Sequence, residues 1–326
     1  MKGFSFLVVA VASAAGPGCG SLASLAEHPS LQGAAGALAS GGVRAGAAAL
    51  PIGLDEELSY GGAIAIQIVQ RYGGLYEDPK AVEYVVSVGD AVAIHSTRPE
   101  LAYHFAILDT DDVNALSAPG GYIFVTRGAL AKMKDEAELA GVLGHEIGHV
   151  CAKHALDIIR KMKAAEQMAS AAADAWKEAA VFSGIVDKYV LEYLEQGLPK
   201  DTEFEADRIG AEMLARIGWR PAGLRDFLAR MAADEAKAPH SAFVKTHPKT
   251  ADRVAALDKA LVGVDARGQA NAERFQAALP VPLPKNPGPA AAPAQTPTPA
   301  PAAAPASDRP TAPARPEPTP TPARPK

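Results

Sequence analysis

Three residues near the middle of this chain have the types and the spacing needed to hold and use a metal ion. His145 and His149 stand four positions apart, and Glu146 directly follows the first of them. In a helix, residues four apart lie on one face about one turn from each other, so both imidazoles could bind one ion. Glu146 would then project beside that ion, where a carboxylate can accept a proton from water.

The segment that must position these residues is a helix that begins at Asp135. Asp135, with Glu138 three positions later, resembles a capping box. Apolar residues then recur at helical spacing and predict a buried stripe, at Leu139, Leu143, Ile147 and Val150. His-Glu-x-x-His on such a helix is typical of zinc peptidases, in which two imidazoles leave room for a third ligand and for water. The pattern also arises by chance in many proteins, so the rest of the chain must support it.

A second acidic segment could complete this metal site. Asp201 opens a predicted helix that runs to Ile217 and is ended by Gly218. Glu203 and Asp207 lie four positions apart and therefore on one face of that helix. Glu203 could supply a third ligand, and Asp207 could orient a ligand imidazole through its free N–H group.

Two further residues near these segments have competing interpretations. Glu205 could replace Glu203 as the ligand, since acidic residues in the first turn of a helix are common and complement the helix dipole. His154 follows His149 by five positions, about 140° around a continuous helix, and is expected to point away from the metal. It would then lie either at the surface or behind a ligand.

The segments before the motif predict a small antiparallel sheet in a mainly helical α+β domain. Three β-like runs cover residues 103–108, 113–117 and 122–126, and turn residues 118–121 separate the last two. Helices are expected at 55–72, at 79–95, at 162–180 with a break near Ser183-Gly184 before a further stretch to Gln196, and at 249–262.

The third β-like run could bind a substrate. An exposed edge strand beside a metal site can pair with an extended peptide through backbone hydrogen bonds. We expect this strand at Gly121, Tyr122, Ile123 and Phe124. An ordinary internal sheet strand is the alternative interpretation.

The first 18 residues predict an export signal of the lipoprotein type. A short basic start is followed by an apolar run, residues 4–15, that is too short to span a membrane. Cys19 stands where such a signal places its lipid-accepting cysteine, which predicts a lipid anchor at Cys19 and a location in the periplasm at the outer membrane. Ordinary cleavage at Ala12-Ser13-Ala14 is the alternative.

Composition divides the remaining chain into three parts. Residues 19–53 are rich in Ala and Gly and predict a flexible spacer, and residues 54–279 suit one folded domain. Residues 280–326 predict a disordered tail, because 17 of the 27 prolines lie there and aromatic residues are absent. The tail's positive charge could contact anionic envelope polymers, with a plain spacer as the alternative. The net charge of −5 argues against a general nucleic-acid-binding protein.

Taken together, these segments resemble the zinc endopeptidase family that contains HtpX, BepA, LoiP and the mitochondrial Oma protease. The resemblance spans residues 54–261 and rests on four segments: His145-Glu146-Ile147-Gly148-His149, Glu203-Phe204-Glu205-Ala206-Asp207, Asn114 through Gly128, and Thr246-His247-Pro248 with Arg253. It implies a zincin-type fold in which His145, His149 and Glu203 bind one zinc ion, Glu146 is the general base and Asp207 supports a ligand. It also selects Glu203 over Glu205 as the ligand.

The resemblance further implies an endopeptidase that acts on unfolded or misassembled envelope proteins. His247 matches the family's His-Pro position, and we expect it either to stabilise the oxyanion or to ligate zinc in a resting state. A loop histidine without a role is the alternative. The alternative function is a non-catalytic, metal-containing assembly or chaperone-like factor, against which Glu146 argues because a structural metal needs no base.

Overall fold

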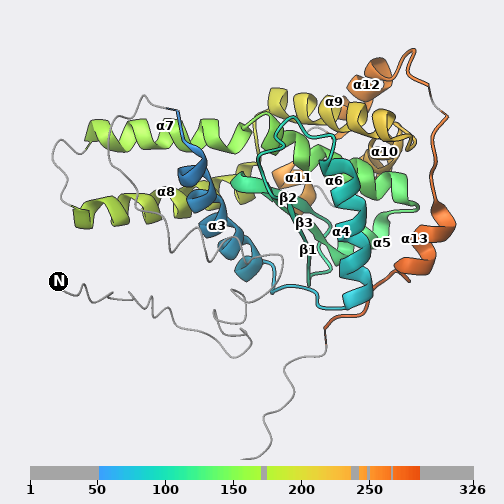
Figure 1. Cartoon of the computed structure of the whole chain (residues 1–326), viewed down its shortest axis with the longest axis horizontal. Helices are drawn as coiled ribbons and strands as arrows, with labels where there is room; N and C mark the ends of the chain where they lie inside the picture. The colour runs from blue at the N-terminus through green and yellow to red at the C-terminus, as the bar shows by residue number, and fades with distance from the viewer. Residues whose placement is uncertain (1–50, 170–174, 236–241, 248–249, 266, 287–326) are drawn as a thin grey trace, which may run out of the picture. The chain divides into compact units, whose positions relative to one another are not determined.

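The computed structural model describes residues 51–286, except 170–174, 236–241, 248–249 and 266 (Figure 1). The predicted export signal at 1–18, the anchor residue Cys19, nearly all of the spacer at 19–53 and the tail from residue 287 onward lie outside the described residues. No helix within the described ranges is long and apolar enough to cross a membrane.

The elements confirm a mainly helical α+β fold. The strands are β1 (His104–Leu108), β2 (Ala115–Ala118) and β3 (Tyr122–Thr126), with the short 3-10 turn η2 (Pro119–Gly121) between the last two. The helices are α3 (Leu54–Arg71), α4 (Pro79–Ala93), α5 (Arg127–Lys132), α6 (Glu136–Cys151), α7 (His154–Ala169), α8 (Ala175–Gln196), α9 (Lys200–Ile217), α10 (Gly223–Glu235), α11 (Ala242–Thr246), α12 (Thr250–Ala260) and α13 (Ala272–Ala278).

The sheet is mixed, so the prediction of a purely antiparallel sheet is wrong. Its strand order is β1-β3-β2, in which β2 pairs antiparallel and β1 parallel with β3. The turn at η2, where Gly120 and Gly121 both have positive φ, folds β3 back onto β2. That hairpin leaves the far edge of β3 open to β1, which runs in the same direction as β3 and pairs with it.

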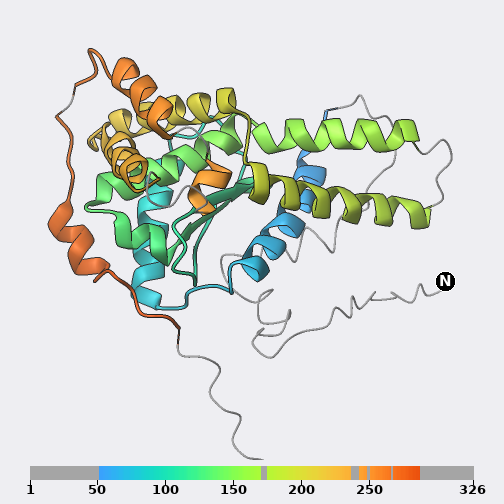
Figure 2. The ribbon, with the colours of Figure 1, turned by 180° about the vertical axis from the view of Figure 1, so that it is seen from behind.

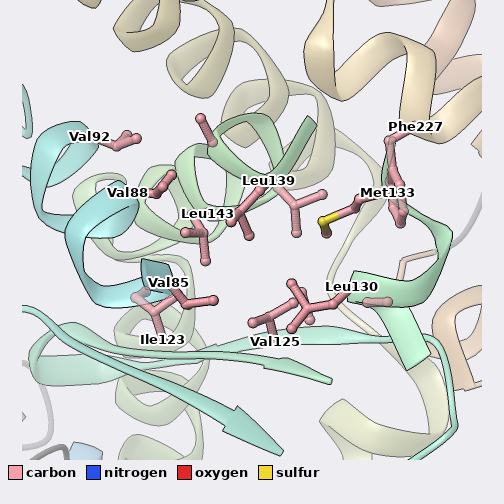
Figure 3. Close-up of a cluster of buried hydrophobic side chains, with 14 of the residues drawn as sticks. Val85, Val88, Val92, Ile123, Val125, Leu130, Met133, Leu139, Leu143 and Phe227 are labelled. Atoms are coloured by element: carbon pink, nitrogen blue, oxygen red, sulfur yellow. The ribbon is translucent and has the colours of Figure 1, made fainter. Parts of the chain in front are cut away.

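Helices cover both faces of this sheet. Alternate residues of β3 point to opposite faces: Ile123 and Val125 join one apolar cluster, whereas Tyr122 and Phe124 join another. The first cluster packs against α4 and α6, as Figure 3 shows for Val85, Val88, Leu139 and Leu143. The second packs against α3, α7 and α8, so the sheet forms the middle layer.

Helices α7 and α8 lie side by side and extend beyond the sheet (Figures 1 and 2). Helix α8 is continuous, so the predicted break at Ser183-Gly184 is wrong. A glycine inside a helix costs only about 1 kcal/mol. The buried residues Ile185, Val186 and Tyr189, which lie in the same helix within five positions after Gly184, outweigh that cost by packing in the second cluster.

The folded body also extends beyond the predicted domain boundary at residue 279. We call residues 267–286 the C-terminal strap. At one end of the strap, Arg274 and Asn271 donate to Glu136, the first residue of α6. At the other end, Leu283 is buried and Asn286 donates to the carbonyl of Leu75. The packed chain therefore continues through Asn286.

Candidate metal centre

The centre is built where α6 and α9 approach each other closely. Glycines on both helices permit this: a Cβ atom added at Gly148 would lie 2.8 Å from the carbonyl oxygen of Ala206, and one added at Gly210 would lie 2.9 Å from the carbonyl carbon of Gly144. The contact brings the His-Glu-x-x-His face of α6 against the acidic face of α9. The capping of α6 follows the prediction at Asp135, whose side chain accepts from the Glu138 N–H at 3.0 Å.

The three predicted ligands converge at this crossing. The Nε2 atoms of His145 and His149 lie 3.0 Å apart. The Glu203 carboxylate lies 3.3 Å from His149 Nε2 and 3.6 Å from His145 Nε2. Ligands bound tetrahedrally at zinc distances stand about 3.3 Å apart. The donor spacing and the two-imidazole, one-carboxylate donor set therefore fit a zinc ion.

His247 joins these residues directly after α11. Its Nδ1 lies 3.1 Å from Glu203 Oε2, and its Nε2 lies 3.0 Å from the carbonyl oxygen of Ala115. The ring is buried, and its ligand atom lies within 4.8 Å of those of the other three residues. The structure thus places His247 in the centre, although its role stays a prediction.

Glu146 is buried beside the metal-binding residues, and within the described part of the chain neither of its carboxylate oxygens has a hydrogen-bond partner. Its Oε1 lies 3.6 Å from His247 Nε2. This arrangement leaves both oxygens available to accept a proton.

Asp207 lies behind His145 and is itself held by a residue whose place in the site the sequence did not predict. Its Oδ1 is 2.8 Å from His145 Nδ1. Arg253 donates to Asp207 at 2.6 and 2.9 Å and pairs with Glu203 at 2.9 Å. Arg253 is only 1 % exposed, so its charge offsets two buried carboxylates. No spacing signal could connect it to Asp207, because 46 positions separate them.

Burial and these neighbours shift the pKa values of the centre in opposite directions. Burial, reinforced by Arg253 and His149, lowers the pKa of His145 to about 4. Burial also acts to lower the pKa of His247, but the Glu203 and Glu146 carboxylates outweigh it and raise that pKa. Burial acts to raise the pKa of Asp207, but Arg253 outweighs it and holds that pKa well below its usual range.

His154 is buried and faces His149, a predicted metal ligand. Its Nδ1 lies 2.9 Å from His149 Nδ1, and its Nε2 lies 3.3 Å from Glu205 Oε2. His154 thus lies behind a predicted ligand rather than at the surface, as one of the two alternatives had it, and it can turn back toward His149 because α6 ends at Cys151. Lys153 then takes a left-handed conformation with φ 60°, and α7 begins in a new direction. Of the two candidate acidic residues, Glu203 lies beside the predicted ligands His145 and His149, and Glu205 lies beside His154.

The predicted substrate strand does not form an edge. Residues Tyr122, Ile123 and Phe124 belong to β3, which pairs with β1 and β2 on its two sides, and Gly121 belongs to η2. Their backbone groups are therefore engaged within the sheet. Strand β2 is the edge strand on the metal side, and its Ala115 carbonyl accepts from His247.

A small hollow lies between β2, α8 and the junction of α6 and α7. Its lining includes His149 of the metal centre and Ser117 of β2, together with Lys153, Leu156 and Tyr189. The Tyr189 hydroxyl is buried and has no hydrogen-bond partner among the described residues. This side of the centre therefore keeps a small unfilled space, whereas the side that faces α9 is closely packed.

Comparison with known proteins agrees with this geometry. The chain is 27% identical over 235 residues to the beta-barrel assembly-enhancing protease of Yersinia pestis, covering 68% of this chain and 45% of that protein. It is 29% identical over 219 residues to the protein of the same name from Escherichia coli K12, covering 61% of this chain and 41% of that protein. It is 28% identical over 178 residues to mitochondrial metalloendopeptidase OMA1 of Schizosaccharomyces pombe, covering 54% of this chain and 52% of that protein.

The chain thus spans about half the length of these relatives. The sequence model of peptidase family M48 matches residues 79–261, which include α6, α9, His247 and Arg253 and make up more than half of the chain. The chain belongs to peptidase family M48.

Proposed function

We propose that this protein is a zinc-dependent endopeptidase that cleaves unfolded or misassembled proteins of the cell envelope. One observation carries the proposal: three buried metal-ligating side chains converge beside Glu146, whose carboxylate has no hydrogen-bond partner in the described chain. A metal held only for structure would need no such carboxylate. The family match and the names of the relatives support the same activity.

The residues would divide the chemistry between them. His145, His149 and Glu203 would hold zinc, which supplies Lewis-acid chemistry by acidifying water and polarising a carbonyl group. Glu146 accepts the proton that the attacking water loses and donates it to the departing amine. Asp207 and Arg253 keep His145 and Glu203 in place.

His247 has two roles open to it. Its Nε2, which lies 3.0 Å from the Ala115 carbonyl oxygen, could instead donate to the oxyanion of the transition state. Its position among the other ligand atoms would also let it occupy a fourth ligand position in a resting state. His247→Ala separates these roles: a slower reaction supports donation, a faster one supports the resting ligand, and an unchanged rate removes His247 from the catalytic residues.

The substrate backbone has one natural place to bind. Strand β2 lies at the sheet edge next to α6, and an extended peptide can add to such an edge through backbone hydrogen bonds. The bond between His247 and the Ala115 carbonyl occupies part of that edge. Displacement of His247 by substrate would therefore free an acceptor for the peptide.

The proposed cellular location and partners of the protein rest on its amino-acid sequence. Export through residues 1–18 and lipidation at Cys19 would place the domain at the outer membrane, and two of the relatives are named for β-barrel assembly. The Pro-rich tail would act as a spacer or contact anionic envelope polymers. Cys19→Ser in cells supplied with labelled palmitate tests the anchor: loss of label supports it, whereas an unlabelled wild type contradicts it.

The activity is tested with the purified full chain, an unfolded model protein and matched zinc content. Glu146→Gln should abolish cleavage without releasing zinc, whereas Glu212→Gln, on the exposed face of α9, should cleave like wild type. Cleavage that survives in Glu146→Gln would exclude Glu146 as the base. Zinc bound by wild type without any cleavage would favour the non-catalytic assembly factor.

A further inference from the structure

We propose that His154 and Glu205 form a hydrogen-bond relay that orients His149 and fixes which of its ring nitrogens faces the metal. The relay is a positioning device, and it rests on the proposed zinc site. It would explain why a histidine outside the His-Glu-x-x-His motif is buried against a motif residue. His154 was not among the predicted ligands, and neither His154 nor Glu205 belongs to the group of residues whose ligand atoms converge.

The ring nitrogens of His149 face two different partners. Its Nε2 points to the ligand atoms of His145 and Glu203, at 3.0 and 3.3 Å. Its Nδ1 points the other way, to His154 Nδ1 at 2.9 Å. A neutral imidazole that ligates through Nε2 carries its proton on Nδ1, so His149 must be the donor in this bond.

That assignment fixes the proton of His154 as well. Because His154 Nδ1 accepts from His149, the single proton of a neutral His154 must lie on Nε2. The atom that faces Nε2 is Glu205 Oε2 at 3.3 Å, and a carboxylate can only accept. The three groups therefore have one consistent direction of donation, from His149 to His154 and from His154 to Glu205.

Three separate elements supply this relay. His149 lies in the last turn of α6, His154 is the first residue of α7, and Glu205 lies in α9. Lys153 has φ 60°, a conformation that L side chains seldom adopt, and it turns His154 back toward His149. Residues that hold strained backbone conformations cluster at functional sites.

The two ligand histidines would thus be supported differently. His145 contacts the buried carboxylate of Asp207 directly, at 2.8 Å. His149 reaches a carboxylate only through a second imidazole, and the Glu205 side chain is 51 % exposed. Partners of this kind orient a ligand and raise its basicity, and their loss typically weakens metal binding about 10- to 100-fold.

Zinc affinity of the purified full chain, measured by competition with a chromophoric chelator, tests the relay without relying on activity. His154→Phe keeps a ring but removes the acceptor, and it should weaken zinc binding about 10- to 100-fold. His154→Asn places an amide oxygen near the position of Nδ1 and should stay within about threefold of wild type. Glu205→Gln should weaken zinc binding about threefold, because a half-exposed carboxylate interacts weakly. Glu212→Gln, on the same helix, should leave zinc affinity unchanged.

The outcomes separate the relay from the site on which it rests. A wild type that binds no zinc would overturn the proposed function as well as the relay. Wild-type affinity in His154→Phe would overturn the relay alone. Equal losses in His154→Phe and His154→Asn would also overturn it, since packing rather than an acceptor would then be responsible.

Nitrogen-15 NMR of histidine-labelled, zinc-loaded wild type provides a second readout that a merely structural residue would not move. The relay predicts a His154 ring with an unprotonated Nδ1 and a protonated Nε2, assigned through the signals missing in His154→Asn. A protonated Nδ1 on His154 would contradict the relay even if the Phe variant failed to fold.

Discussion

The two sides of α6 differ in how closely they are packed. On the side facing α9, small residues let the two helices touch, and Arg253 pairs with both Asp207 and Glu203. On the side facing β2 and α8, a hollow remains and the hydroxyl of Tyr189 has no partner among the described residues. We infer that the first side holds the predicted metal-binding residues rigidly, whereas the second keeps a small unfilled space.

This difference makes opposite predictions for substitutions on the two sides. Changes on the α9 side should destabilise the protein and weaken metal binding. Changes on the β2 and α8 side should leave the fold intact.

Arg253→Met should have the largest effect on stability. It leaves the Asp207 and Glu203 carboxylates buried without their common cation, which should lower the free energy of unfolding by about 3–5 kcal/mol. Urea unfolding of the metal-free protein measures this loss of stability. The control is Arg267→Met, whose side chain is 91% exposed and pairs with Asp265, and which should change stability by less than about 0.5 kcal/mol. Similar small losses of stability in both variants would contradict the inference that the α9 side is held rigidly.

Acid should destabilise the metal-free protein through His145. Its pKa is lowered to about 4 in the folded state, against about 6.5 when unfolded, so the unfolded chain binds more protons between these values. The free energy of unfolding should therefore fall as the pH drops from about 6.5 to about 4, by up to roughly 3 kcal/mol. His247, with its raised pKa, acts oppositely, and its contribution is lost as the pH rises above about 6.5.

Urea unfolding of wild type and His145→Asn over this pH range isolates the contribution of His145. The free energy of unfolding of the variant should fall less steeply as the pH drops, because the imidazole with the lowered pKa has been removed. Parallel curves for the two proteins would mean that His145 titrates normally in the folded protein.

Gly210→Ala tests the close approach of α6 and α9. The added methyl group would lie 2.9 Å from backbone atoms of Gly144 and His145, so the helices must separate, which should cost about 1–3 kcal/mol and weaken zinc binding. Gly184→Ala is the matched control in α8, where an added Cβ meets nothing within 4 Å. That change should stabilise by up to about 1 kcal/mol. Stabilisation in both variants would show that the crossing tolerates more room than the structure indicates.

Tyr189→Phe should have the smallest effect and the opposite sign. Removing a buried hydroxyl without a partner should stabilise the protein by about 1 kcal/mol or less, as thermal or urea unfolding would show. Tyr84→Phe is the contrast, because the Tyr84 hydroxyl donates to Glu136 at 2.6 Å and its loss should destabilise by about 1–2 kcal/mol. Destabilisation of similar size in both would mean that Tyr189 has a partner in solution.

The parts of the site that sequence predicts are those set by spacing within one helix. His145, Glu146 and His149 share a turn of α6, and Glu203 and Asp207 share a turn of α9. A helix has a fixed rotation per residue, so these relations follow as soon as the helix is recognised. The capping residues that mark its start are equally local.

The parts that sequence did not predict depend on contacts between distant segments or on an unmarked change of direction. The order of the strands is set by which edge of β3 receives β1, and no residue pattern specifies that edge. The orientation of His154 depends on the left-handed conformation of Lys153, where glycine or asparagine would normally signal the end of a helix. Arg253 reaches Asp207 only because α12 packs on α9.

The anchoring of Glu136 by the C-terminal strap has a consequence for the order of synthesis. The ribosome makes α6 early, but Glu136 in its first turn accepts from Asn271 and Arg274, which are made more than a hundred residues later. His247 and Arg253 also come late in the chain. A nascent chain that ends before these residues carries the His-Glu-x-x-His segment without the partners that fix it. Translation order thus delays completion of the centre until nearly the whole folded body has been made.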